Sequence, residues 1–166
     1  MVDVFIVSGA RTPVGAFGHF FGRMGCFFAG CCYGTPTDSA LGVRMVEGSG
    51  AYQVLSRMQP PLVEAGRTVP LVPTQAMEAV FELLLAAALS ALLLRRPRPG
   101  SVFFGYMLCY PVFRFAIETV RFDPERGTVL GGLLSTSQAL SVAFFALGVG
   151  GIIWTRVAGS DRPIAA

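Results

Sequence analysis

Four long apolar stretches divide the chain, and each approaches the length that a helix needs to cross a bilayer. They are residues 14–33, 76–94, 102–120 and 139–154. A bilayer core takes about 20 apolar residues in a helix. The last stretch reaches this length with help from Leu133 and Leu134 or from tilt. The pattern predicts an all-α membrane protein with about four transmembrane helices.

The polar sequence between the first two stretches has a different character. Residues 35–72 hold prolines, glycines and short runs in which apolar and polar positions alternate. Such runs indicate short strands, so we predict a small extramembrane arm here and not a separate domain. Thr74, which follows Pro73, is expected to be the N-cap of the next helix.

The distribution of arginine predicts the orientation of the helices. The link at residues 95–98, between the second and third stretches, is the densest basic loop. Because basic loops face the cytoplasm, we expect this link and the C-terminal tail there, and residues 35–72 on the outer side. The start of the chain lacks the basic region and the cleavage site of a secretory signal peptide, so none is expected.

Composition agrees with a membrane protein. Hydrophobic residues make up 53% of the 166 and charged residues only 14%, against about 25% charged in a soluble domain. All 13 basic residues are arginine, which indicates either a demand for phosphate-binding groups or, the favoured interpretation, a genome rich in G and C. The net charge of +3 is small and scattered, so no nucleic-acid partner is expected.

Charged residues inside the third apolar stretch are the main candidates for function. A charge at the centre of a membrane helix costs about 2.5–3.5 kcal/mol on insertion scales, and such residues are functional by default. At 100° per residue four polar side chains share one face of this helix, and they are Tyr110, Arg114, Glu118 and Arg121. This stripe is expected in the outer leaflet, where it can meet a lipid phosphate. The alternative is that Arg114 and Glu118 only neutralise each other and hold helices together.

Arg23 places another positive charge in the first apolar stretch. Gly18 and Gly22 form a G-x-x-x-G pattern there, which permits close contact between helices. The next carboxylate along the chain is Asp38, so Arg23 needs an anion from elsewhere. A lipid phosphate and Glu118 of another helix both stay open as its partner.

Histidine and cysteine add weaker candidates. His19 is the only histidine, and the sequence identifies no partner for it, so a catalytic role is the minor alternative. The spacing of the four cysteines fits no standard zinc pattern. For Cys31 and Cys32, small apolar packing is favoured over a nucleophile, an acylation site or a disulfide.

Several motifs resemble one known family. Residues 22–34, Gly-Arg-Met-Gly-Cys-Phe-Phe-Ala-Gly-Cys-Cys-Tyr-Gly, resemble the Gly-Arg-x-Gly motif of prolipoprotein diacylglyceryl transferases, in the Gly-Cys-Cys-Tyr-Gly variant. Residues 73–79, Pro-Thr-Gln-Ala-Met-Glu-Ala, are similar to the family's Pro-Ser/Thr-Gln-Leu-Tyr-Glu segment. Residues 96–103, with the polar stripe after them, are similar to its next helix. By this resemblance, which extends from about Gly18 to Trp154, the chain is identified as a member of the family.

The resemblance implies an enzyme of a bacterial cytoplasmic membrane that crosses it several times. Such an enzyme moves a diacylglyceryl group from phosphatidylglycerol to the lipobox cysteine in the signal peptide of a preprolipoprotein, forms a thioether and releases glycerol phosphate. It implies no metal and no cofactor. The residues it assigns are Arg23, Arg114 and Glu118 as catalytic groups and Tyr110, Arg121, Gly22 and Gly34 as substrate-binding groups.

Some positions depart from the family pattern. Cys26 and Ala29 stand where the family has asparagine, Cys31 stands where it has an acidic residue, and helices that precede the Gly-Arg motif in the family are not found. Residues 2–17 resemble instead the first strand and turn of a thiolase. The sequence therefore predicts an unrelated extension at residues 1–17, a transferase-like membrane domain at 18–156 and a cytoplasmic tail at 157–166. The alternative function is a catalytically silent lipid-binding membrane module or a gene fragment.

Overall fold

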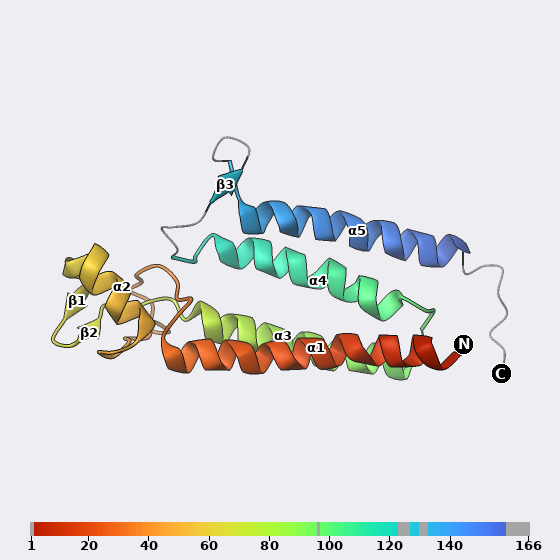
Figure 1. Cartoon of the computed structure of the whole chain (residues 1–166), viewed down its shortest axis with the longest axis horizontal. Helices are drawn as coiled ribbons and strands as arrows, with labels where there is room; N and C mark the ends of the chain where they lie inside the picture. The colour runs from red at the N-terminus through yellow and green to blue at the C-terminus, as the bar shows by residue number, and fades with distance from the viewer. Residues whose placement is uncertain (1, 96, 123–126, 130–132, 159–166) are drawn as a thin grey trace. The chain divides into compact units, whose positions relative to one another are not determined.

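The computed structural model describes residues 2–95, 97–122, 127–129 and 133–158. Helices dominate these residues, and four short strands form two antiparallel pairs. In chain order the elements are α1 (Val2–Ala29), α2 (Gly50–Met58), the 3-10 helix η1 (Pro60–Leu62), β1 (Val63–Glu64), β2 (Arg67–Thr68), α3 (Thr74–Leu94), α4 (Ser101–Glu118), β3 (Thr128–Val129), β4 (Leu134–Ser135) and α5 (Thr136–Ala158) (Figure 1). The predicted helical character is confirmed.

Two of the described helices, α3 and α5, are long and apolar enough to cross a membrane. The other two long helices differ from them in having a proline inside the helix. Helix α1 has 28 residues and contains Pro13, while α4 has 18 residues and carries Arg114. The expectation of about four spans is therefore met in part, by two helices that pass on length and composition.

The boundaries of two helices correct the expectations from sequence. Helix α1 begins at Val2 and not near residue 14, so residues 2–17 are helical and do not form the strand and turn that a thiolase would have. Helix α4 ends at Glu118, short of the predicted residue 120. Its end is tightened by backbone N–H groups of residues 119 to 121 that donate to the carbonyls three positions earlier, the bond pattern of a 3-10 turn. Arg121 therefore lies outside the helix.

The chain divides into two compact units, and the first comprises residues 1–17, 83–115 and 127–166. Within it α4 and α5 lie side by side (Figure 1). A Cβ on Gly151 would overlap the ring of Phe104, and one on Gly148 would lie 3.0 Å from the carbonyl of Met107. Only glycine permits this approach. Large apolar side chains of α5, among them Phe144 and Trp154, are exposed, as a lipid-facing helix requires.

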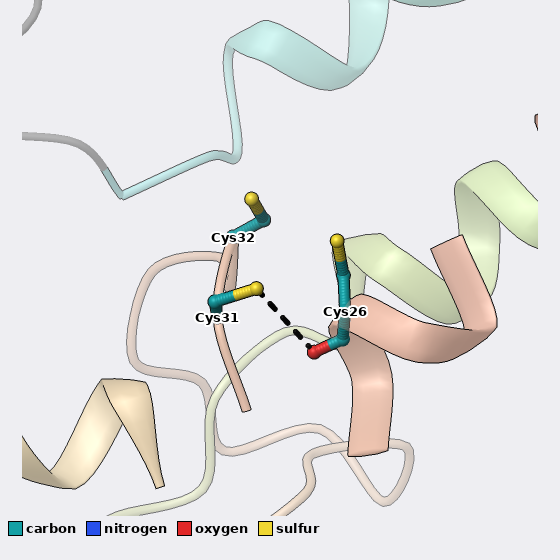
Figure 2. A group of neighbouring side chains, drawn as sticks. All are labelled: Cys26, Cys31 and Cys32. Carbon is teal, nitrogen blue, oxygen red and sulfur yellow. Dashed lines mark hydrogen bonds between the residues drawn. The ribbon is translucent and has the colours of Figure 1, made fainter. Parts of the chain in front are cut away.

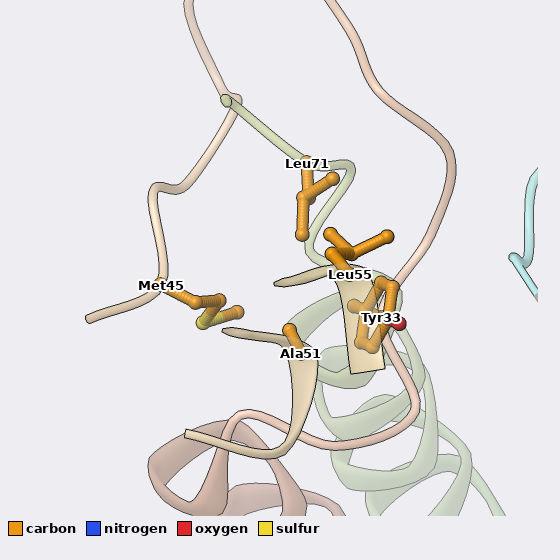
Figure 3. Close-up of a cluster of buried hydrophobic side chains, with 5 residues drawn as sticks. All are labelled: Tyr33, Met45, Ala51, Leu55 and Leu71. Atoms are coloured by element: carbon orange, nitrogen blue, oxygen red, sulfur yellow. The ribbon is translucent and has the colours of Figure 1, made fainter. Parts of the chain in front are cut away.

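The second unit comprises residues 18–82 and 116–126 and contains the arm. A small apolar core holds the arm together (Figure 3), formed by Tyr33, Met45, Ala51, Leu55 and Leu71. Helix α2 begins where the Ser49 side chain accepts a hydrogen bond from the backbone N–H of Tyr52, a standard N-cap. The strands β1 and β2 confirm the predicted short strands of the arm.

Candidate functional site

Two contacts between basic and acidic side chains join α1 and α3 within the second unit. Nδ1 of His19 lies 2.9 Å from a carboxylate oxygen of Glu82, and Nε of Arg23 lies 2.7 Å from one of Glu78. On each helix the two residues are four positions apart, hence one turn apart on one face. Because the number rises on α1 as it falls on α3, the helices run antiparallel here and the pairs form successive rungs.

The first turn of α3 continues this arrangement to the segment after α1. The hydroxyl of Thr74 donates to the carbonyl of Cys32 at 2.7 Å, and Nε2 of Gln75 donates to the carbonyl of Cys31 at 2.6 Å. Both α3 side chains are buried. Thr74 was expected to be the N-cap of α3, but it is the first helical residue and its hydroxyl bonds the preceding segment instead. The segment is thereby fixed to the start of α3.

Arg121 reaches the same place from the end of α4. It forms an isolated antiparallel bridge with Gly34, flanked by a 2.9 Å hydrogen bond from the N–H of Thr35 to the carbonyl of Val120. A Cβ on Gly34 would lie 2.7 Å from that carbonyl, so only glycine lets the two backbones meet. The predicted substrate-binding residue Gly34 thus has a steric role in positioning Arg121.

Glu78 is the point where the two arginines converge. Its carboxylate lies against Nε of Arg23, and its other oxygen lies 3.8 Å from Nη1 of Arg121. The side chains of Glu78 and Arg121 are only 4% and 8% exposed. Nε of Arg121 is buried and has no hydrogen-bond partner among the described residues. Two guanidinium charges share one carboxylate, so this cluster carries one surplus positive charge.

The contact between Arg23 and Glu78 is an ion contact more than a hydrogen bond. The two atoms are close at 2.7 Å, yet the Arg23 Nε–H is not aligned for a hydrogen bond. A guanidinium has five N–H donors in a planar fork, and one misaligned contact leaves most of that capacity unused by Glu78. An anion with several acceptor oxygens suits such a pair of arginines better than a single carboxylate.

The other predicted site residues are divided between the two units. Tyr110 and Arg114 lie on α4 in the first unit, where the Tyr110 ring stacks on Tyr106 and Arg114 is buried. Glu118 is the last residue of α4 and belongs to the second unit. The predicted stripe therefore holds for three residues of one helix, and its fourth member, Arg121, lies beyond the helix end.

Comparison with known proteins decides the family. A family model described as prolipoprotein diacylglyceryl transferase matches residues 1–154. The chain belongs to this family. It is 39% identical over 151 residues to phosphatidylglycerol–prolipoprotein diacylglyceryl transferase 2 of Clostridium perfringens, covering 91% of this chain and 51% of that protein. The corresponding proteins of Clostridium tetani (35% over 147 residues, 89% and 52%) and Hydrogenovibrio crunogenus (30% over 155 residues, 92% and 53%) are also similar.

The chain spans about half the length of the curated relatives that it matches. The match to this family of membrane proteins includes residues 1–17 as well as the later helices. The boundaries proposed from sequence, at residues 17 and 156, remain predictions.

The acidic residues of this cluster were not identified from the sequence. It left a lipid phosphate and Glu118 open as partners of Arg23, whereas the carboxylate that contacts Arg23 is Glu78. It gave His19 no partner, whereas Glu82 lies beside it. A signal was present, because Glu78 and Glu82 on α3 and His19 and Arg23 on α1 have the same spacing of four. The expected close helix contact at Gly22 is absent, since a Cβ there would meet no described atom within 4 Å.

The cysteines after α1 lie near this site but do not resemble a nucleophile. Burial is the main cause that raises the pKa of the Cys31 thiol to about 12, and the neighbouring Cys26 and Cys32 add to it. Because the thiolate is the reactive form of cysteine, Cys31 is a neutral and unreactive thiol at neutral pH. This agrees with the sequence-based preference for packing over covalent chemistry.

Proposed function

We propose that this chain binds the phosphate of phosphatidylglycerol between Arg23 and Arg121 and takes part in moving its diacylglyceryl group to a preprolipoprotein cysteine. The observation that carries the proposal is the carboxylate of Glu78 in contact with the guanidinium groups of Arg23 and Arg121, whose side chains are 14% and 8% exposed. The surplus charge attracts one anion. At about 4 Å such an attraction is about 4 kcal/mol in a protein of effective dielectric constant 20, against about 1 kcal/mol in water.

The chemistry of the reaction fits this cluster. The sulfur of the acceptor thiol forms a bond to the terminal glycerol carbon of the diacylglyceryl group, and the bond from that carbon to the phosphate oxygen breaks. The oxygen keeps the electron pair and leaves as glycerol phosphate, which carries more negative charge than the lipid did. Planar arginine donors stabilise that developing charge, and Glu78 keeps both guanidinium groups directed to one place.

The thiol proton needs an acceptor, and His19 is suited to that role. Nδ1 of its ring lies 2.9 Å from the buried carboxylate of Glu82, without an aligned hydrogen bond, and in other sites a carboxylate in this place holds a catalytic imidazole. His19 lies one helical turn from Arg23. We assign His19 as the general base and Arg23 as the phosphate ligand.

The polar stripe of α4 carries a separate proposal, which rests on the sequence. Arg114 of the first unit is proposed to contact a lipid phosphate, with Tyr110 and Glu118 of the same helix contacting the lipid. Gly22 is proposed to leave space beside Arg23 for the substrate, because nothing described lies within 4 Å of the position its Cβ would take.

The proposed topology places α1, α3, α4 and α5 across a bacterial cytoplasmic membrane. The link at residues 95–98 and the C-terminus then face the cytoplasm, and the arm faces outward. A cysteine introduced at position 97 should be labelled by a membrane-impermeant maleimide only after the cells are opened. Labelling in intact spheroplasts would reverse this orientation.

The transfer reaction itself tests the proposal. The purified chain in phosphatidylglycerol nanodiscs is incubated with a synthetic lipobox peptide, and the peptide mass is measured together with released glycerol phosphate. We expect a diacylglyceryl adduct and an equal amount of glycerol phosphate, with a turnover at least tenfold lower for His19→Gln at unchanged lipid binding. Lipid binding without any adduct would exclude transfer by this chain and favour a lipid-binding membrane module.

A further inference from the structure

Three of the four cysteines gather at the C-terminal end of α1. The sulfur atoms of Cys26, Cys31 and Cys32 all lie within 4.8 Å of one another. Figure 2 shows the Cys31 side chain pointing toward Cys26, where its sulfur lies 3.7 Å from the Cys26 carbonyl oxygen. All three are partly buried free thiols, whereas Cys109 on α4 is exposed and lies in the other unit. The mechanism proposed above uses none of the four.

The end of α1 explains why two of these thiols meet. Gly30 has a φ of +65°, its N–H donates to the carbonyl of Phe27, and the N–H of Cys31 donates to the carbonyl of Cys26. These are the two hydrogen bonds of a Schellman motif, which also brings the side chains of its first and last members together. A contact between small apolar groups would satisfy the motif, so Cys26 and Cys31 alone indicate no ligand.

The third thiol is not required by the motif. Cys32 has a φ of +60°, a left-handed conformation that costs about 1–2 kcal/mol for a residue with a Cβ. The carbonyls of Cys31 and Cys32 are held by Gln75 and Thr74 of α3. With this conformation the Cys32 sulfur lies within 4.8 Å of the other two, on a backbone that α3 holds in place. Strain kept at one position by surrounding bonds is typical of functional sites.

The distances between the sulfur atoms suit a soft metal ion. Three thiolates around one ion at about 2.3 Å each are separated by about 3.8–4.0 Å, so rotation of the side chains by less than about 1 Å closes the ring from 4.8 Å. Structural zinc takes four ligands, and the described residues bring only three together here. Cu(I) prefers soft sulfur ligands and commonly binds two or three of them.

We propose that Cys26, Cys31 and Cys32 form a three-thiolate binding site for one thiophilic cation, Cu(I), at the end of α1. Binding exchanges up to three thiol protons for the ion. It ties the end of α1 to the segment that α3 holds.

A competition titration tests the site. The full-length chain is purified in detergent, fully reduced under nitrogen and titrated with Cu(I) against the chelator bicinchoninate. We expect one Cu(I) per chain, and at least tenfold weaker retention in Cys26→Ala, Cys31→Ala and Cys32→Ala. The matched control Cys109→Ala should retain the ion as the parent does. Unchanged melting temperatures of the apo variants establish that the loss is not due to misfolding.

Alkylation supplies a second readout that does not depend on any variant. Without Cu(I), iodoacetamide should modify Cys109, Cys26 and Cys32, and bound Cu(I) should protect Cys26 and Cys32 but not Cys109, as mapped by mass spectrometry. Equal modification of Cys26 and Cys32 with and without Cu(I) would overturn the proposal, as would retention of Cu(I) that depends on Cys109. Zn(II) retained in preference to Cu(I), with the same dependence on the three cysteines, would overturn the choice of ion.

Discussion

The two compact units hold their helices together in opposite ways. In one, α5 brings Gly148 and Gly151 against α4, where glycine backbone meets the Met107 carbonyl and the Phe104 ring. In the other, α1 and α3 meet through the contacts of Arg23 with Glu78 and of His19 with Glu82, whose carboxylates are buried. Replacing buried ion pairs by well-packed apolar side chains is often neutral or stabilising, and small residues suffice for packing in lipid. Because α4 and α5 of the same chain pack closely through glycines, charged contacts are not needed to hold helices together. The charged rungs between α1 and α3 therefore indicate function more than stability.

The largest effect should come from Glu78, which compensates two largely buried arginines. Replacing it by alanine leaves both charges without this carboxylate, so we expect a loss of about 3–5 kcal/mol in the free energy of unfolding. Denaturant unfolding in detergent micelles measures this loss, with exposed Met77→Ala on the same helix as the control. A loss below 1 kcal/mol would show that the arginines are not balanced by Glu78.

The stability of the first unit, which contains α4 and α5, should fall when a single methyl group is added between these helices. Gly151→Ala forces a Cβ into the ring of Phe104, and overpacking of this kind costs about 1–3 kcal/mol. The neighbouring Gly150 has no described atom within 4 Å of the corresponding position, so Gly150→Ala should be close to neutral. Equal melting temperatures for the two variants would contradict the close packing of α4 and α5.

A smaller effect, on lipid binding, is expected from replacing Arg114. Two variants distinguish a role of Arg114 in lipid binding from a role in helix packing. Lysine cannot present the planar fork of arginine, so Arg114→Lys should fold normally and bind phosphatidylglycerol several-fold less well. If Arg114 only pairs with Glu118, replacing both by leucine should be tolerated. Native mass spectrometry of the parent and both variants measures the lipid bound. Unchanged binding in both would assign Arg114 to packing alone.

The smallest effect is expected for the vicinal cysteines. Replacing Cys31 and Cys32 together by alanine should leave phosphatidylglycerol binding within a few-fold of the parent, because the reacting thiol of the proposed reaction belongs to the acceptor. The same lipid titration measures this. Complete loss of transfer in a folded double variant would instead indicate a covalent mechanism through one of these thiols.

The sequence predicts the apolar helices and the arm well, because each depends on local periodicity and composition. The site was predicted only in part. Arg23 and Arg121 were found as charges in or beside apolar stretches, but their meeting at Glu78 depends on how three distant segments pack. Arg121 was expected on the face of the α4 helix but lies three residues beyond its end, since the tight last turn of α4 and the bridge to Gly34 end the helix before it.

The local motif at Gly30 could have been predicted, because a glycine directly after a helical stretch is the usual signal of a Schellman end. That the three sulfur atoms lie close together could not have been predicted from the sequence. It depends on the left-handed conformation of Cys32 and on hydrogen bonds from α3, which no local pattern indicates.

The most direct test of the proposed lipid site compares two pairs of arginines that differ only in place. Phosphatidylglycerol is titrated into the parent, into Arg23→Lys/Arg121→Lys and into Arg44→Lys/Arg57→Lys, whose side chains are exposed in the arm, and bound lipid is counted by native mass spectrometry. All three chains keep the same net charge. We predict at least tenfold weaker binding for the first pair and parental binding for the second. Equal affinities in all three would contradict a phosphate site between Arg23 and Arg121.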